Sequence, residues 1–313
     1  MGTMMALRAH VRGGPEQLVY EQAPAPTAGP GEALVAVHAA AITFAELTWD
    51  LSWTTRDGAD RTPVIPSHEM SGVIAGLGDG VTSRAVGDEV VGLIDFDRDG
   101  AAAEYVAVPA ATLAGKPPSL SHERAATLPL AALTAWQALV EYAAVEPGER
   151  VLVQGGAGGV GLFAVQLAAI LGGRVTATGR AADADLVRDL GAERFISFDA
   201  PDGAETPGGL DVVIDTVGGA ALDGSYAMLR EGGRLVTLTA PPDPERAAKR
   251  RIHAMSFVVA QDPDGLANLA RMTDAGQLRT VLSQTFPLAE GRSAFQSGGH
   301  PHPPGKTVLV VRE

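Results

Sequence analysis

The chain of 313 residues contains no cysteine. This absence excludes disulfide bonds, thiol nucleophiles and every zinc site built from cysteine. Basic residues are fewer than acidic ones. The chain has 24 Lys and Arg and 37 Asp and Glu, which gives a formal net charge of −13. A chain of this charge repels polyanions, so we expect neither a nucleic acid nor an anionic membrane surface as a partner.

Long apolar runs are also missing. The sequence has no run of about 18 apolar residues, so no membrane-spanning segment is predicted. Residues 1–10 lack the apolar stretch of a signal peptide, and we expect a cytoplasmic protein. Aromatic residues are only 5% of the chain, but a hydrophobic content of 46% rich in Ala, Gly and Val suits a parallel sheet packed closely by helices.

The order of patterns along the chain predicts two domains of different class. Residues 6–118 are mainly β, with short runs punctuated by Gly and Asp, at 33–39, 72–77, 89–94 and 103–108. Helical spacing begins after Ser121. Six β-runs then alternate with helical patterns such as 182–190 and 220–229, and these runs are 151–154, 174–177, 195–196, 212–215, 234–238 and 256–259. This alternation predicts an α/β domain with a doubly wound parallel sheet. The tail holds a predicted helix at 266–275 and a strand at 307–311, which we expect to return to the β-rich domain.

A glycine turn at the end of the first of these six runs organises the second domain. Gly156, Gly158 and Gly161 form a G-x-G-x-x-G between a strand pattern and a helix pattern. Such glycines permit a tight turn, a close approach of the backbone to a pyrophosphate and close packing of helix on strand. We expect Ala157, Gly158, Gly159 and Val160 to hold the phosphates. The alternative is a purely structural turn. In a chain so rich in glycine, a pattern of three fixed glycines is expected by chance roughly 0.5 times.

The second strand of that domain indicates which dinucleotide binds. NAD sites place an acid about 20 residues after the turn, whereas NADP sites offer space and a cation. Here the strand ends Thr178-Gly179-Arg180, with no acid at its tip. We therefore predict NADPH, with Arg180 at the phosphate. The alternatives are a solvated Arg180 and a ribose contact by Asp183.

Several segments in the same order along the chain resemble the medium-chain dehydrogenase/reductases, in their zinc-free quinone oxidoreductase branch. The segments are Pro66-Ser67-His68-Glu69, Gly78-Asp79-Gly80-Val81, Val86-Gly87-Asp88-Glu89-Val90, Ala103-Glu104-Tyr105, Leu128 to Ala135, Asp215 to Gly219, Gly232 to Val236 and Gly305 to Leu309.

The resemblance implies a GroES-like β-rich catalytic domain, residues 1–120 completed by 261–313. It also implies a six-stranded Rossmann domain, residues 121–260, and NADPH in the cleft between the two. It implies a homodimer as well. Zinc is not expected, because the family's metal ligands include cysteines. The cofactor contacts that it implies are Thr134, the turn from Gly156 to Gly161, Thr178 to Arg180, Asp215 to Gly218 (Asp215, Thr216, Val217, Gly218), Thr239, Ala240, Phe257, Val258 and Val259.

The acceptor side of the reaction is expected in residues 43–69. His68 is the first candidate for a proton donor or oxyanion partner, and Thr43 and Thr48 are weaker ones. The alternatives are a buried His68 bonded to Glu69 or the backbone, and water as the proton source. Trp49 and Trp53, with Asp95 at the rim, are candidate contacts for an aromatic or polycyclic substrate, unless the indoles pack the β domain.

These observations predict an NADPH-dependent oxidoreductase that delivers hydride to a quinone, an enone or a related carbonyl compound without a metal. Two alternatives stay open. One is an enoyl- or ketoreductase, or a non-redox cyclase, of a specialised pathway. The other is a protein that binds a nucleotide without turnover.

Overall fold

A computed structural model describes residues 2–198 and 207–312. The chain forms two compact units, which we call unit 1 (Met1–Leu130 with Gln261–Glu313) and unit 2 (Ala131–Ala260). The first boundary therefore lies at 130/131, whereas the sequence placed it at 120/121. Within the described residues, no helix has both the length and the apolar character needed to cross a bilayer.

Unit 1 is built on a seven-stranded sheet with the order β14-β15-β3-β4-β5-β7, in which β6 also pairs with β3. A separate hairpin is formed by β1 and β2. The strands are β1 (Thr3–Ala9), β2 (Leu18–Pro24), β3 (Glu32–Ala41), β4 (Glu69–Leu77), β5 (Glu89–Leu93), β6 (Tyr105–Pro109), β7 (Leu113–Gly115), β14 (Leu282–Pro287) and β15 (Lys306–Val310). The helices of this unit are α1 (His122–Ala125), α7 (Pro263–Asp274) and α8 (Gly291–Gln296).

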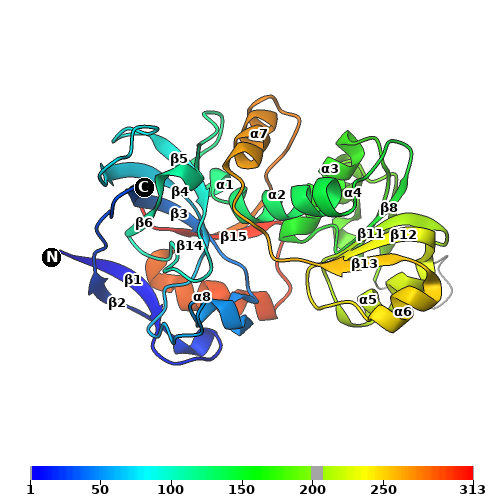
Figure 1. The fold of residues 1–313 in the computed structure, drawn as a ribbon, viewed down its shortest axis with the longest axis horizontal. Helices are drawn as coiled ribbons and strands as arrows, with labels where there is room; N and C mark the ends of the chain where they lie inside the picture. The colour runs from blue at the N-terminus through cyan, green and yellow to red at the C-terminus, as the bar shows by residue number, and fades with distance from the viewer. Residues whose placement is uncertain (1, 199–206, 313) are drawn as a thin grey trace. The chain divides into compact units, whose positions relative to one another are not determined.

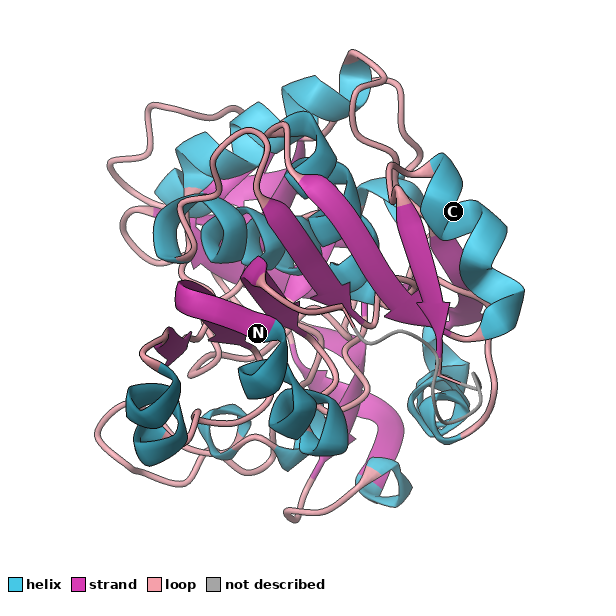
Figure 2. Ribbon diagram, turned by 90° about the vertical axis from the view of Figure 1, so that its right-hand side faces the viewer, coloured by secondary structure: helices cyan, strands magenta, loops and turns pink. Residues whose placement is uncertain are grey.

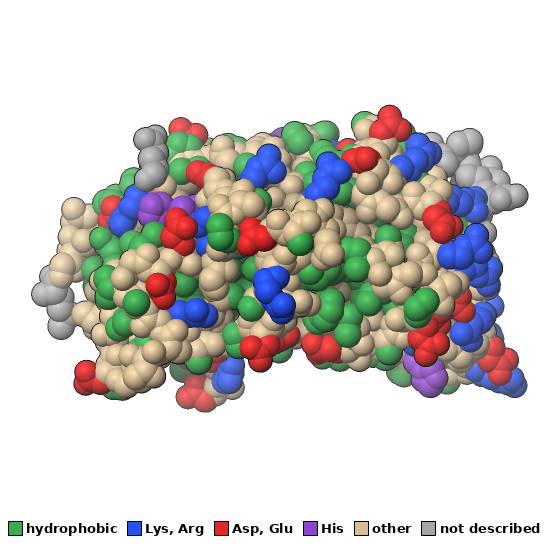
Figure 3. All heavy atoms as spheres, turned by 90° about the horizontal axis from the view of Figure 1, so that it is seen from above, with side chains coloured by type: hydrophobic (Ala, Val, Ile, Leu, Met, Phe, Trp, Pro, Cys, Tyr) green, Lys and Arg blue, Asp and Glu red, His purple; other side chains and the backbone are tan. Residues whose placement is uncertain are grey.

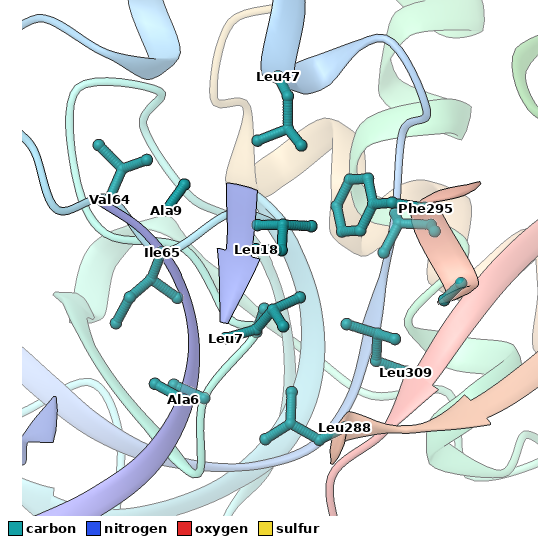
Figure 4. Packing of buried hydrophobic residues seen from close by; sticks show 14 of the residues in the cluster. Ala6, Leu7, Ala9, Leu18, Leu47, Val64, Ile65, Leu288, Phe295 and Leu309 are labelled. Atoms are coloured by element: carbon teal, nitrogen blue, oxygen red, sulfur yellow. The ribbon is translucent and has the colours of Figure 1, made fainter. Parts of the chain in front are cut away.

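The return of the tail to the β-rich domain is confirmed, because β15 pairs antiparallel with β3 through Val308–Ala41 and Val310–Ala39. Side chains of β15 close a hydrophobic cluster with β1, β2 and α8. Leu309 lies there beside Leu7, Leu288 and Phe295, and all four are almost fully buried (Figure 4). Strands β1 and β15, near the two ends of the chain, thus contribute to the same hydrophobic core.

Unit 2 contains the predicted doubly wound sheet. All six strands are parallel, in the order β10-β9-β8-β11-β12-β13, which is the strand order of a Rossmann fold. The strands are β8 (Arg150–Gln154), β9 (Arg174–Gly179), β10 (Arg194–Ser197), β11 (Leu210–Asp215), β12 (Leu229–Thr237) and β13 (His253–Ser256).

Helices cover both faces of this sheet, with α3 and α4 on one side and α5 and α6 on the other (Figures 1 and 2). They are α3 (Gly159–Ile170), α4 (Ala184–Asp189), α5 (Gly219–Met228) and α6 (Pro244–Arg250). Helix α2 (Pro129–Trp136) enters the unit and continues as a π-helix over Gln137–Tyr142.

The predicted position of the sixth strand was wrong. The strand is β13, His253–Ser256, and not 256–259. Its partner β12 ends at Thr237, which pairs with Ser256, so no ladder exists for the residues that follow. The apolar run of Phe257 to Val259 is not core either, because Val258 is 59% exposed.

Candidate active site

The glycine turn lies between strand β8 and helix α3, as predicted, and it is bonded to the carboxyl ends of the neighbouring strands. The amide of Gly155 donates to Thr178 Oγ1 at 3.1 Å, and the amide of Gly156 donates to the Thr178 carbonyl at 2.8 Å. Thr216 Oγ1 donates to the Gln154 carbonyl at 2.7 Å. The turn after β8 is therefore fastened to the ends of β9 and β11, at the edge where ligands of such sheets bind.

The turn fits a dinucleotide pyrophosphate. A Cβ on Gly161 would lie 2.0 Å from the Gly155 carbonyl oxygen, so only glycine lets α3 pack this closely on the turn. Gly158, the exposed N-cap of this 12-residue helix, has no side chain that could occupy the first-turn N–H groups. Those donors and the helix dipole favour an anion at this end.

At the tip of β9, Arg180 lies beside Asp183. The Arg180 Nε donates to Asp183 Oδ2 at 3.1 Å, and the side chain of Asp183 is 7% exposed whereas that of Arg180 is 41% exposed. The buried carboxylate therefore anchors the arginine. This pairing and the burial of Asp183 argue against a direct contact between Asp183 and the ribose. Both Thr178 and Gly179 leave little side-chain bulk at the tip.

Asp215 differs from the prediction. It is fully buried, and its two oxygens accept from the amides of Val217 and Gly218 at 3.2 and 3.1 Å and from the hydroxyl of Thr237 at 3.0 Å. Thr239 Oγ1 also donates to it, at 3.3 Å. Asp215 thus shapes the turns after β11 and β12 and cannot itself contact a cofactor. Val217, at 45% exposure, remains accessible on that turn, and Ala240 follows Thr239.

The remaining cofactor candidates lie on α2 and after β13. Thr134 is 7% exposed in α2, and Phe257 stacks on Tyr142 with ring centroids 4.2 Å apart. Both belong to unit 2, together with the glycine turn.

In unit 1, both ring nitrogens of His68 are already bonded. Nδ1 lies 2.6 Å from Glu46 Oε1, and Nε2 lies 3.1 Å from the carbonyl oxygen of Arg98. His68 is 2% exposed, and Glu46 Oε1 also accepts from the Ser67 amide at 2.7 Å. The buried alternative describes this residue better than the proton-donor role, although its carboxylate partner is Glu46 and not Glu69.

The next residue, Glu69, belongs to a different buried cluster. Its Oε1 forms an ion pair with Lys306 Nζ at 2.5 Å, and its Oε2 accepts from the Leu130 amide at 3.0 Å. Lys306 Nζ also donates to Thr43 Oγ1 at 3.1 Å. Thr43 is therefore engaged with the lysine that starts β15. Thr48 is exposed, and its hydroxyl donates to the Ala45 carbonyl at 2.7 Å.

The two tryptophans of unit 1 have different environments. Trp53 is 2% exposed in the hydrophobic cluster, and its indole N–H donates to the Leu47 carbonyl at 3.0 Å. Its predicted substrate role is therefore wrong, because a core side chain presents no face to a ligand. Trp49 is half-buried and meets Phe96 edge-on at 5.6 Å. Asp95 is paired with Arg56 at 3.2 Å.

Sequence reasoning missed three residues that determine this arrangement, namely Glu46, Phe96 and Lys306. The ring of Phe96 lies 5.1 Å from that of His68, so Trp49, Phe96 and His68 form a continuous aromatic series. Two of the three had a signal, since Lys306 stands in the family-like Gly305-Lys306-Thr307 segment and Phe96 follows the predicted rim residue Asp95. Glu46 lies 22 residues before His68, and no spacing rule connects them.

The side chains that the structure describes are not arranged as the ligands of a metal ion would be. Among residues 2–198 and 207–312, no three His, Asp or Glu side chains are grouped as metal ligands would be. The chain has no cysteine, and His68 is bonded at both nitrogens.

A separate pocket of about 400 Å³ lies at the opposite edge of the unit 2 sheet, where strands begin. Its lining includes Arg150, Arg174 and Arg194, the first residues of β8, β9 and β10. Figure 3 shows Lys and Arg side chains gathered with acidic ones at the right of the face that it draws. Arg174 pairs with Glu193 and Arg150 with Asp211, so we do not assign this pocket to the cofactor.

Comparison with known proteins identifies the class. Residues 29–118 match the family model for the alcohol dehydrogenase GroES-like domain, and residues 183–309 match that for zinc-binding dehydrogenase. The solved quinone oxidoreductase from Coxiella burnetii superposes with a TM-score of 0.90, at 31% identity over 99% of this chain and 100% of that one.

The chain is also similar to two curated relatives. The mitochondrial NAD(P)H oxidoreductase RTN4IP1 of Danio rerio is 30% identical over 80% of this chain and 73% of its own length. Polyketide synthase GfsB of Streptomyces halstedii is 34% identical over 90% of this chain, which spans only 5% of that relative's length. The chain belongs to the medium-chain dehydrogenase/reductase superfamily, whose oxidoreductases use a nicotinamide cofactor.

Proposed function

We propose that this protein is an NADPH-dependent reductase that transfers hydride to a quinone, an enone or a related carbonyl compound, without a metal. The observation that carries the choice of NADPH is the tip of β9. There Thr178 joins the glycine turn, and the partly exposed Arg180 is held by the buried Asp183. A partly exposed arginine fixed at the end of this strand suits a ribose phosphate, and no acid stands at residues 178–180 to favour a ribose hydroxyl.

When it is bound, the nicotinamide supplies the hydride, and the protein supplies position and surroundings. Hydride addition to an enone or carbonyl leaves a negative charge that a proton must quench. Because both nitrogens of His68 are bonded inside the protein, we assign the proton to water and give His68 the role of supporting the wall that carries Phe96 and Trp49. An aromatic wall of this kind favours a flat, conjugated acceptor.

Substitution of Arg180 tests the preference for NADPH. Arg180→Ala should raise the KM for NADPH by about tenfold or more, as expected for the loss of a charge-assisted contact, and leave the KM for NADH nearly unchanged. Arg188→Ala is the matched control, because Arg188 also pairs with an acid three residues away but is exposed on α4. Turnover is followed by NADPH absorbance with a panel of quinones and enones. Equal losses for both cofactors would refute the assigned role of Arg180.

A second candidate is supported by the polyketide synthase relative. For this second candidate we propose an enoyl thioester of a specialised pathway as the acceptor, reduced with the same cofactor. Adding short enoyl thioesters to the same panel separates the two, since a pathway reductase should turn them over faster than it turns over simple quinones.

A further inference from the structure

After β13 ends at Ser256, residues Phe257–Ala260 run to the end of unit 2 without regular secondary structure, and we call them the post-β13 segment. Val258 in its middle is 59% exposed. Among the residues that the structure describes, the peptide groups of Val258 and Val259 form no hydrogen bond. These peptide groups are thus available to a ligand. Because no strand pairing holds the segment, other contacts must fix its conformation.

The end of the segment is held by one side chain. Gln137 Nε2 donates to the Ala260 carbonyl at 3.0 Å, and Gln137 Oε1 accepts from the Ala260 amide at 3.0 Å. The side-chain amide thus pairs with both backbone groups of one residue, as a neighbouring strand would. Gln137 is 2% exposed, so its side-chain amide is largely shielded from bulk water.

The start of the segment is held by a ring. Tyr142 stacks on Phe257 with centroids 4.2 Å apart and planes inclined by 23°. Tyr142 is 38% exposed, so it packs on Phe257 at the surface and not inside the core. The two contacts therefore secure the first and the last residue of the segment and leave Val258 and Val259 between them.

The π-helical turn explains why both contacts come from one helix. Gln137 and Tyr142 are the first and last residues of the π-helix, and the Ala143 amide donates to the Ala138 carbonyl five residues back, at 2.9 Å. In an α-helix, residues five apart point about 140° away from each other. The wider π turn brings them towards one side, and such turns are frequent at functional sites.

We propose that Gln137 and Tyr142 are positioning residues, which hold the post-β13 segment so that the peptide groups of Val258 and Val259 meet the carboxamide of bound nicotinamide. This inference rests on the function proposed above. A segment that is already ordered does not lose freedom when the cofactor binds, so the two side chains contribute to affinity for the nicotinamide half of the cofactor.

The test compares a whole cofactor with a fragment that lacks nicotinamide. Gln137→Met keeps the length of the side chain but removes both hydrogen bonds, and Tyr142→Ala removes the stacked ring. By calorimetry, each should raise the Kd for NADPH by about tenfold and leave the Kd for 2′,5′-ADP within about twofold of the original. Tyr142→Phe retains the ring and should bind both ligands as the unaltered protein does.

Three outcomes would overturn the proposal. The first is an unchanged Kd for NADPH in both Gln137→Met and Tyr142→Ala. The second is an equal loss of NADPH and 2′,5′-ADP, which would indicate damage to the whole nucleotide site. The third is a Tyr142→Phe variant as weak as Tyr142→Ala. Failure of the unaltered protein to bind NADPH would instead refute the proposed function itself, so the two failures are distinguishable.

Discussion

The carboxylate of Glu69 is 1% exposed, and among residues 2–198 and 207–312 the cation paired with it is Lys306. Removing one partner of a buried ion pair leaves the other charge uncompensated, which commonly costs about 3–5 kcal/mol. We therefore predict that Lys306→Met lowers the free energy of unfolding by about 3 kcal/mol. Denaturation in urea, followed by circular dichroism, measures this change.

Two further variants isolate the buried charge as the cause. The double variant Lys306→Met with Glu69→Gln should recover much of the loss, because no unpaired charge remains. Arg174→Met should change stability by less than about 1 kcal/mol, since Arg174 and Glu193 are both more than half exposed. A single Lys306→Met variant as stable as the original would show that Glu69 is compensated in another way.

Single residues also mark the limit of what the sequence could predict about the site. The glycine turn and the tip of β9 were predictable, because both depend on residues that are adjacent in the chain. A buried His68 was one of the alternatives, but its partners Glu46 and Arg98 could not be predicted, since they reach it from 22 and 30 residues away. Trp53 illustrates the same limit, because a tryptophan side chain suits a binding site as well as it suits a hydrophobic core.

At the level of elements, α1 meets β3 and β4 through two histidines. The rings of His38 and His122 stack with centroids 4.2 Å apart, and His122 Nδ1 lies 2.8 Å from Ser71 Oγ. Burial is the main cause that holds the pKa of His122 below its ordinary value of 6.5, followed by the charges of His38 and Lys116, while Glu89 and Glu123 act in the opposite direction. Burial likewise lowers the pKa of His38, with Arg312 acting in the same direction.

This pair predicts a pH dependence of stability. Below the ordinary pKa, the unfolded chain takes up protons that the folded pair resists, so the free energy of unfolding falls as the pH drops through 6.5 towards the folded-state pKa. Urea denaturation at about pH 7.5 and about pH 5.5 measures the fall. His122→Gln should reduce it, whereas His300→Gln, at an exposed position, should not. A fall of equal size in the His122→Gln variant would contradict the assignment.

Two of the strands that the sequence did not predict share a physical property. Strands β2 and β14 carry polar or exposed side chains at most positions, so their hydrophobic alternation is weak. They are strands because a partner supplies the ladder, as β15 does for β14 and as β1 and β2 do for each other. The sixth strand shows the converse, since the apolar residues after Ser256 have no partner beyond Thr237 and form no strand.

At the scale of the whole molecule, the first and last strands of the chain share one core, and the Rossmann sheet has a core of its own. Leu309 of β15 belongs to the cluster with Leu7 and Phe295, whereas Leu235 of β12 belongs to a cluster with Val213 and Tyr226. Both leucines are fully buried, so each substitution by alanine should cost about 2–5 kcal/mol.

Because the two leucines lie in separate cores, we predict that their effects are local as well as large. Hydrogen exchange followed by mass spectrometry should show that Leu309→Ala lowers amide protection in β1, β3 and β15, and that Leu235→Ala lowers it in β11 and β12. The remaining strands should keep most of their protection in each case. If either variant loosened the strands of both units to the same extent, the two units would unfold as one cooperative structure, and the division at 130/131 and 260/261 would have no energetic meaning.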